Sequence, residues 1–374
     1  MQSDETHPIL SVAVVGATGY AGGEAVRILA THPYFRVTTV AGRSSVGHKF
    51  GEYAPHIPQL SELVVQDTTP EHLNGHDVVI LALPHGASGK IAEQLSDVQV
   101  IVDLGADHRL ESAADWDAFY GGDFYEPWVY GMPELLTSAI DAHISSDTKL
   151  TFQRNNLIGA TRIAGPGCNV TATTLAFQPA ISAGLVDTNI TANLVVGYSG
   201  AGKNLGRINL LAAQALGSAT AYAVGGKHRH IPEIKQNFTH AAGVSVDHAS
   251  EFSLGFTPVL APMSRGIFAT VSAPLSDQGW ALSDDDIRQV YEQVYKNQSF
   301  IHLLPQGMIP ATADVVGSNS AQLQVAVDRN AGLLYAFCAI DNLNRGTAGQ
   351  AIESLNIALG LPEDAGLTTI GVAP

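Results

Sequence analysis

One of the two cysteines stands in a setting that suits a nucleophile. Cys168 follows a Gly-Pro-Gly run, which interrupts regular structure, and precedes a stretch compatible with a helix. A thiol at a helix N-terminus lies near the positive end of the helix dipole and near unpaired amides, which lower its pKa. The same amides would stabilise an oxyanion on an attacked carbonyl group. We therefore predict that Cys168 is a nucleophilic thiolate, with an inert cysteine at a helix start as the alternative; Cys338, in an apolar strand, is expected to be a core residue.

A nucleophilic thiol needs a partner for proton transfer, and the segment Lys227-His-Arg-His-Ile-Pro-Glu233 offers one. His230 precedes a helix that a proline initiates, and Glu233 follows three residues later, close enough to orient the imidazole. General acid–base catalysis by such a histidine contributes about 10²- to 10⁴-fold in rate. A structural His230 is one alternative. A metal site of His228, His230 and Glu233 is another, but no second ligand cluster supports it, so we expect no metal.

A glycine-rich turn near the N-terminus has the spacing of a dinucleotide-binding loop. Gly16, Gly19 and Gly22 follow the first apolar run and open a helical stretch. Gly16 permits the tight turn, Gly19 lets the backbone approach a pyrophosphate, and Gly22 allows close packing of helix and strand. The helix N-terminus then offers amides and a positive dipole end to the phosphates. A purely structural turn is the alternative interpretation.

The end of the second apolar run indicates which nucleotide binds. An NAD site places an Asp or Glu there to hold the ribose 2′-hydroxyl. This sequence has Arg43, Ser44 and Ser45 at that place, with no acidic residue before Glu52. An arginine and two hydroxyls would accept a 2′-phosphate, which a carboxylate would repel, so we predict NADP. The alternative is that Arg43 lies on a solvated loop.

The elements that must position these residues fall into two groups. Short apolar runs alternate with helical stretches in the first hundred residues, which predicts a doubly wound parallel sheet of the Rossmann type. The expected strands are 9–15, 36–41, 77–83 and 98–104, and the expected helices are 24–31 and 87–95.

The second half has a different character, and we expect an α+β domain there. Its helix at 284–296 follows the capping residue Ser283, and a last helix is expected at 347–359. We predict a dinucleotide-binding domain of residues 1–166 and 341–374 and a catalytic and oligomerisation domain of 167–340. The expected strands of this second domain are 190–196, 252–260, 267–273, 321–327 and 333–340.

Composition excludes several classes of protein. The 374 residues are 45% hydrophobic and 14% charged, which argues against disorder, and two cysteines form no disulfide framework. A formal charge of −16 disfavours nucleic acid and anionic membranes as partners. No apolar run approaches the roughly 20 residues of a membrane helix, and the first residues do not resemble a signal peptide. We expect a soluble, cytoplasmic protein.

Together the motifs resemble those of the N-acetyl-γ-glutamyl-phosphate reductases, which belong to the wider group that contains aspartate-semialdehyde dehydrogenase. The glycine turn, the cysteine turn and the His228-Arg-His-Ile-Pro-Glu-Ile234 segment share the order and spacing of that family. The likeness extends from about residue 9 to about residue 360. Further matching segments begin at Asp103, Gly197, Ala261 and Asp341.

The resemblance implies an NADPH-dependent reductive dephosphorylation that releases N-acetylglutamate semialdehyde and phosphate in arginine biosynthesis. Cys168 would carry the acyl group as a thioester, with His230 as proton shuttle and Glu233 as its partner. A homodimer or homotetramer is expected through the middle sheet. The cofactor-binding residues that we expect are Gly16, Thr18, Gly19, Tyr20, Gly22, Arg43, Ser44 and Asn342. The expected substrate-binding residues are Arg109, Tyr198, Lys203 and Arg265, with Arg109 first for the phosphate because a guanidinium binds it in a bidentate manner.

Two positions depart from the family pattern. Asn169 follows the cysteine where Tyr or Phe is usual, and Phe177 replaces an aliphatic residue. The first departure keeps open a reductase of an N-acetyl- or carrier-linked aminoadipyl phosphate from the lysine pathway, one methylene longer. A noncatalytic NADP-sensing protein is a rival from another class, although a sensor has no use for a nucleophile at a helix start.

Overall fold

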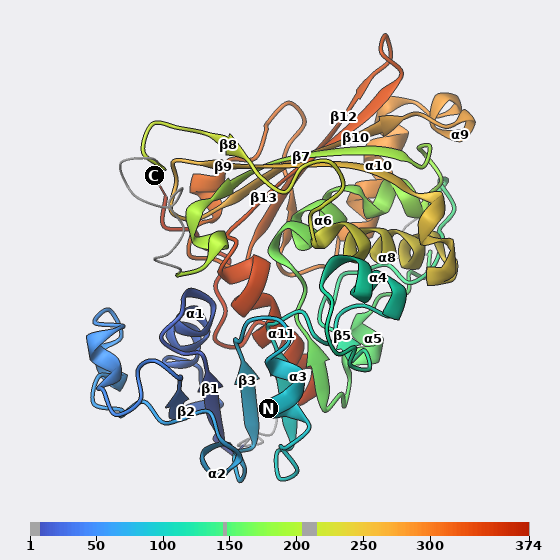
Figure 1. Cartoon of the computed structure of the whole chain (residues 1–374). Coiled ribbons are helices and arrows are strands. Elements are labelled where there is room, and N and C mark those ends of the chain that lie inside the picture. Colours follow the sequence, from blue (N-terminus) through green and yellow to red (C-terminus); the bar gives the residue numbers. More distant parts are fainter. Residues whose placement is uncertain (1–7, 145–147, 204–214, 374) are drawn as a thin grey trace, which may run out of the picture.

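The protein is described by a computed structural model over residues 8–144, 148–203 and 215–373. Two β-sheets lie in separate parts of the molecule (Figure 1). The first sheet takes its strands from residues 10–164 and the second from residues 189–340. In the described ranges no helix is both long and apolar enough to cross a membrane.

The first sheet is parallel throughout, in the order β2-β1-β3-β4-β6-β5. Its central strands are apolar on both faces, since Val12 and Val14 pack in one cluster and Ala13 and Val15 in another. The strands are β1 (Leu10–Val15), β2 (Phe35–Ala41), β3 (Val78–Leu81), β4 (Val100–Asp103), β5 (Val129–Tyr130) and β6 (Arg162–Ala164).

Helices cover both faces of this sheet. The helix α1 packs on one face together with α11, the last helix of the chain, whereas α3 packs on the other face. Figure 1 shows α11, in red, beside the blue and green elements of the first sheet. The helices around this sheet are α1 (Tyr20–Leu29), α2 (Pro70–Leu73), α3 (Ser88–Ala92), α4 (Ala113–Phe119), α5 (Arg154–Leu157) and α11 (Gly349–Ala358).

The second sheet has seven strands, in the order β11-β12-β13-β10-β7-β9-β8, and is mixed in direction. One face is covered by helices, with α6 in the centre and buried on all sides. Its strands are β7 (Asn189–Gly197), β8 (Thr220–Ala221), β9 (Ser253–Ala261), β10 (Ile267–Pro274), β11 (Ile301–Leu303), β12 (Ala321–Asp328) and β13 (Leu333–Ile340). Its helices are α6 (Cys168–Ser182), α8 (His230–Ala242), α9 (Asp277–Ala281) and α10 (Asp284–Tyr295).

The fold class predicted from the sequence is confirmed, and the expected strands and helices are present with shifted ends. Ser283 caps α10 and forms a capping box with Asp286, as its first turn indicated. The last helix differs most from expectation. It begins at Gly349 and is preceded by a π-helix, η7 (Asn344–Ala348), a rare element that often marks functional sites.

Candidate active site

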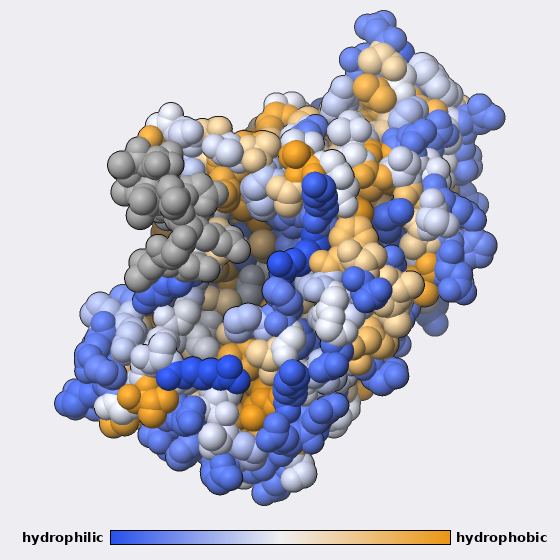
Figure 2. All heavy atoms as spheres, in the orientation of Figure 1, coloured by the Kyte–Doolittle hydropathy of each residue, from blue (hydrophilic) through white to orange (hydrophobic). Residues whose placement is uncertain are grey.

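Two pockets meet between the sheets, and the surface between the two lobes is recessed there (Figure 2). The larger holds about 760 Å³ and the smaller about 520 Å³. Cys168, His230 and Arg109 line both pockets, so the reaction centre lies where they join. Among the described lining residues, neither pocket has an Asp or Glu. In a chain with 35 acidic residues, that distribution favours anionic ligands.

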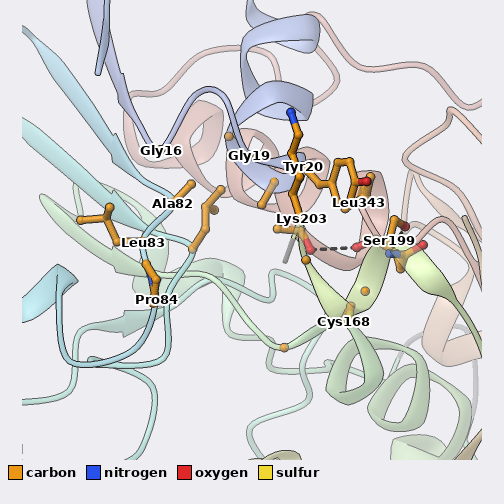
Figure 3. A pocket seen from close by; sticks show the side chains of 18 of the residues that line it. Gly16, Gly19, Tyr20, Ala82, Leu83, Pro84, Cys168, Ser199, Lys203 and Leu343 are labelled. Carbon is orange, nitrogen blue, oxygen red and sulfur yellow. Dashed lines mark hydrogen bonds between the residues drawn. The ribbon is translucent and has the colours of Figure 1, made fainter. Parts of the chain in front are cut away.

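The glycine loop forms one wall of the larger pocket (Figure 3). Gly16 has a φ of +76°, and a Cβ there would lie 2.2 Å from the carbonyl oxygen of Ala82. A Cβ on Gly22 would lie 2.3 Å from the carbonyl oxygen of Gly16. Gly19 precedes α1, and no side chain caps the amides of that helix start. The loop therefore fits the pyrophosphate of a nicotinamide nucleotide, which would lie on these amides.

All eight residues that the sequence assigned to the cofactor line the larger pocket. Arg43 and Ser44 lie just beyond the end of β2, where an NAD site would carry an acidic residue. Thr18 lies 3.2 Å from the hydroxyl of buried Ser45, which ties the glycine loop to that strand end. Asn342 comes from the far end of the chain, and its amide is fixed by the Gly266 N–H and the Ser199 hydroxyl.

Cys168 is the first residue of α6, as predicted. Its neighbour Gly167 has an extended backbone and allows the His230 ring to approach, because a Cβ there would lie 2.5 Å from Nε2. Gly346 of the π-helix lies on the other side, where a Cβ would be 2.8 Å from the Cβ of Cys168. Two glycines thus leave room for the imidazole beside the turn before Cys168 and for the returning chain against Cys168 itself.

The electrostatics of the thiol differ from expectation. Burial raises the pKa of Cys168 to about 11, although the nearby Arg109 guanidinium and the amides at the helix start act in the opposite direction. The prediction of a thiol with a lowered pKa is therefore wrong for the protein without substrate. Desolvation by the surrounding protein outweighs the dipole, although Cys168 itself is only half-buried and lines both pockets.

His230 is a neutral base in this setting. Burial lowers its pKa well below the ordinary value, and the neighbouring His228 and Arg109 act in the same direction. Its backbone N–H donates to Nδ1 of His228 at 3.1 Å. Within the described part of the chain, the Nδ1 of His230 has no hydrogen-bond partner. The imidazole and the thiol are therefore both uncharged, and both line the junction of the two pockets.

Glu233 does not orient the imidazole as the sequence suggested. Its carboxylate is fully buried and accepts hydrogen bonds from the Gly167 N–H at 3.0 Å and the Tyr130 hydroxyl at 2.7 Å. Its other oxygen lies 3.5 Å from a guanidinium nitrogen of Arg109. Spacing along the helix did not reveal these partners, because they come from segments distant from α8 in the sequence. Glu233 holds the turn before the nucleophile and thus acts as a positioning residue.

The four residues expected at the substrate have different places. Arg109 lines both pockets, but its Nε and one Nη donate to the carbonyl oxygens of Gly165 and Leu104. Lys203 lines the larger pocket, with Nζ 3.5 Å from the Thr18 carbonyl oxygen, so it lies on the cofactor side.

Arg265 and Tyr198 line neither pocket. Arg265 pairs with Glu24 of α1 at 2.7 Å and with Asp341 at 3.1 Å, which ties the second sheet to the first domain. The expectation that it meets the substrate therefore does not agree with its position. Tyr198 begins a 3₁₀-helix (Tyr198–Ala201) and donates its backbone N–H to Met263.

The sequence reading missed a buried ionic cluster behind the π-helix. Arg345 is fully buried and pairs with Glu134 and Glu353. Burial and the Glu134 charge raise the pKa of Glu353 well above its ordinary value, whereas the Arg345 charge acts in the opposite direction. Arg345 precedes Gly346, which contacts the nucleophile, so the cluster fixes the wall of the active site. The available signal was a charged residue directly before Gly346 in an otherwise uncharged segment, residues 342–350.

Comparisons with known proteins agree with this geometry. Residues 11–143 match the family described as semialdehyde dehydrogenase, NAD binding domain, and residues 168–342 match its dimerisation domain. Solved structures share the fold: aspartate semialdehyde dehydrogenase with NADP from Candida albicans has a TM-score of 0.64 at 17% identity and covers 93% of this chain and 98% of its own. Aspartate semialdehyde dehydrogenase II from Vibrio cholerae complexed with ASA has a TM-score of 0.62 at 14% identity and covers 93% of this chain and 97% of its own.

This fold and these two domains define an oxidoreductase of the semialdehyde dehydrogenase class. Curated relatives are more specific. The N-acetyl-gamma-glutamyl-phosphate reductase of Bifidobacterium longum (strain DJO10A) is 68% identical over 97% of this chain and 99% of its own length. That of Leifsonia xyli is 49% identical over the same shares. The chain belongs to the N-acetyl-gamma-glutamyl-phosphate reductase family.

Proposed function

We propose that the enzyme reduces N-acetyl-γ-glutamyl phosphate to N-acetylglutamate 5-semialdehyde and phosphate, with NADPH as reductant, in arginine biosynthesis. The observation that carries the proposal is the position of Cys168 and His230 at the junction of a glycine-loop pocket and a second, cationic pocket. One pocket suits the nucleotide and the other the acyl phosphate, and both reach the same sulfur.

The first half of the reaction is acyl transfer to sulfur. The Cys168 thiol gives its proton to the neutral His230, and the sulfur attacks the acyl phosphate carbon. The amides at the start of α6 and the Arg109 charge stabilise the oxyanion that develops. The bond from carbon to the phosphate oxygen breaks, phosphate leaves, and a thioester on Cys168 remains. Because its pKa is raised, the thiol keeps its proton until the substrate is bound, and the proton then moves to His230.

The second half releases the aldehyde. A reduced nicotinamide nucleotide, when bound, supplies the hydride that reduces the thioester carbonyl. His230 returns its proton to the resulting thiohemiacetal oxyanion during hydride delivery, and then accepts the hydroxyl proton as the carbon–sulfur bond breaks. The sulfur leaves as a thiolate, which that proton from His230 converts back to the thiol. Glu233 keeps the Gly167 amide in place throughout.

NADP is proposed because of what lies beyond β2. Arg43 and Ser44 line that end of the pocket, and the described lining residues include no carboxylate that would repel a 2′-phosphate. The reducing cytoplasm is proposed as its compartment, since a catalytic thiol must stay reduced. We also propose domain boundaries at 166–167 and 340–341.

A homodimer or homotetramer is proposed through the outer face of the second sheet. That face carries half-buried aromatic residues, with Phe337 stacked on Phe268 and Tyr335, and Val195 is 40% exposed beside them. A second copy covering this face would bury apolar area that water otherwise contacts. Sedimentation velocity should show a dimer or tetramer, and a monomer at micromolar concentration would contradict the proposal.

The experiment that tests the reaction is trapping of the acyl-enzyme. Intact-mass spectrometry of protein mixed with acyl phosphate but no nucleotide should show the N-acetylglutamyl mass on Cys168. A Cys168→Ser variant should lack both the adduct and measurable turnover, whereas a Cys338→Ser variant should keep both. An active enzyme whose Cys168 never carries the acyl group would disprove the covalent mechanism.

The aminoadipyl phosphate reaction is a second candidate because Asn169, the residue that departs from the family pattern, lines the smaller pocket. One methylene is worth only about 1–3 kcal/mol of discrimination. Steady-state kinetics with both acyl phosphates and both nucleotides decides the question. A higher kcat/KM for the longer substrate would reassign the enzyme.

A further inference from the structure

The smaller pocket is lined by more positively charged side chains than the proposed reaction at Cys168 uses. Arg109, Lys227 and Arg229 line it, and no Asp or Glu does among the described residues. Lys227 and Arg229 form no ion pair within the described ranges, and both are exposed to the pocket. The formal charge of the chain is −16, so two cations without a carboxylate partner on the wall of one pocket favour an anionic ligand there.

Arg229 is held in place without losing its charge. Its Nη1 donates to Nδ1 of His85 at 2.8 Å, and its guanidinium lies 5.6 Å above the Tyr120 ring. The Tyr120 hydroxyl donates to the Arg229 carbonyl oxygen at 3.4 Å. Burial and the Arg229 charge lower the pKa of His85, so this imidazole accepts as a neutral group. The guanidinium is therefore oriented by neutral partners and keeps donors for an anion.

The position of Arg229 indicates which anion it binds. Groups at the reaction centre, such as Cys168 and Arg109, line both pockets, whereas Arg229, Lys227 and His85 line only the smaller one. The phosphoryl group is attached to the carbon that Cys168 attacks, so it must lie at the junction near Arg109. The carboxylate lies at the opposite end of the glutamyl chain, and it therefore extends into the part of the pocket that Arg229 lines.

We propose that Arg229, assisted by Lys227, binds the α-carboxylate of the acyl phosphate and is the residue that selects for this group. This inference rests on the proposed function and adds the residue that orients its substrate. A planar guanidinium, already oriented by His85 and Tyr120, suits a carboxylate in a bidentate manner. Because His85 and Tyr120 belong to the first domain, carboxylate binding also joins the two domains across the cleft.

The test uses the reverse reaction, in which aldehyde and phosphate are separate substrates. An Arg229→Gln variant should raise the KM for N-acetylglutamate semialdehyde about tenfold to a hundredfold, since a charged hydrogen bond is lost. Its KM for phosphate should stay within about twofold, and Arg229→Lys should recover part of the loss. A Lys235→Gln variant, which removes a charge from the same helix outside both pockets, is the matched control.

A substrate analogue distinguishes a loss of carboxylate binding from a shift of the neighbouring His230 caused by the substitution at Arg229. An aldehyde whose carboxylate is replaced by a carboxamide should lose the same factor with the native enzyme, and Arg229→Gln should no longer discriminate between the two. A raised phosphate KM, or unchanged discrimination in Arg229→Gln, would overturn the proposal. Failure of the proposed function looks different, because the native enzyme would then not turn over this aldehyde with phosphate at all.

Discussion

The two pockets that meet at Cys168 differ in what lines them, which is mainly backbone in one and side chains in the other. The larger one is walled mainly by backbone, with glycines that approach other carbonyl oxygens within distances no side chain allows. The smaller one is walled by side chains that come from distant segments and are held by one another, such as Arg229 on His85. A backbone-walled site is specified by a short stretch of sequence, whereas a side-chain site exists only after folding. The comparison predicts different sensitivities to substitution.

The largest effect is expected at the junction. Replacement of His230 by Ala should lower kcat by about 10²- to 10⁴-fold, because the thiol with raised pKa loses its proton acceptor. Stopped-flow measurement of thioester formation should place the defect in acyl transfer. His240→Ala is the control, since it lies on the same helix, pairs with Glu111 and lines neither pocket. Equal activity of both variants would remove His230 from the mechanism.

The backbone wall should be nearly as sensitive. A Gly16→Ala change puts a methyl group 2.2 Å from the Ala82 carbonyl oxygen, so the loop must move. We expect the affinity for NADPH, measured by calorimetry, to fall about a hundredfold, since a shift near 1 Å at such a site has that cost. Gly47→Ala is the matched control because Gly47 has a φ of +83° but open space around it. It should cost only about 1–2 kcal/mol of stability.

The raised pKa of the half-buried Cys168 thiol gives a third, comparable effect. With its pKa at about 11, Cys168 should react with iodoacetamide about a hundredfold more slowly than free cysteine at pH 8, because less of it is thiolate. The rate should rise about tenfold per pH unit up to near pH 11. A Cys168→Ser variant reports any background from Cys338, which is fully buried. A rate that stops rising below pH 8 would show that the pKa of the Cys168 thiol is lowered, as expected from the helix dipole alone.

The smallest effect is expected at the rim of the larger pocket. Replacement of Arg43 by Ala should raise the KM for NADPH about tenfold and leave that for NADH unchanged, because only the former has a 2′-phosphate to lose. Arg36→Ala, an exposed residue in β2, is the control. If Arg43→Ala left the preference for NADPH over NADH unchanged, Arg43 would be a residue of a solvated loop that does not bind the cofactor.

Sequence reasoning was most successful where function is local. The glycine loop and Cys168 at the start of α6 each depend on residues within one short segment, and the fold class follows from the apolar pattern of successive segments, so these could be predicted. The roles of Glu233 and Arg265 could not be predicted, because their partners, such as Tyr130 and Glu24, come from distant segments and linear spacing does not report them. The pKa of Cys168 failed for a related reason, since burial depends on the whole fold. The sequence indicated Arg229 only as part of the segment from His228 to Ile234, without a role of its own.

The helix α11 has a consequence for the folding of the first domain. The helix α11 and the π-helix before it complete both the apolar face shared with α1 and the wall beside Cys168. Without these residues the first domain would expose an unfinished apolar face, and the nucleophile would lack the glycine that packs against it. A fragment truncated before residue 341 should therefore aggregate rather than act as a smaller enzyme.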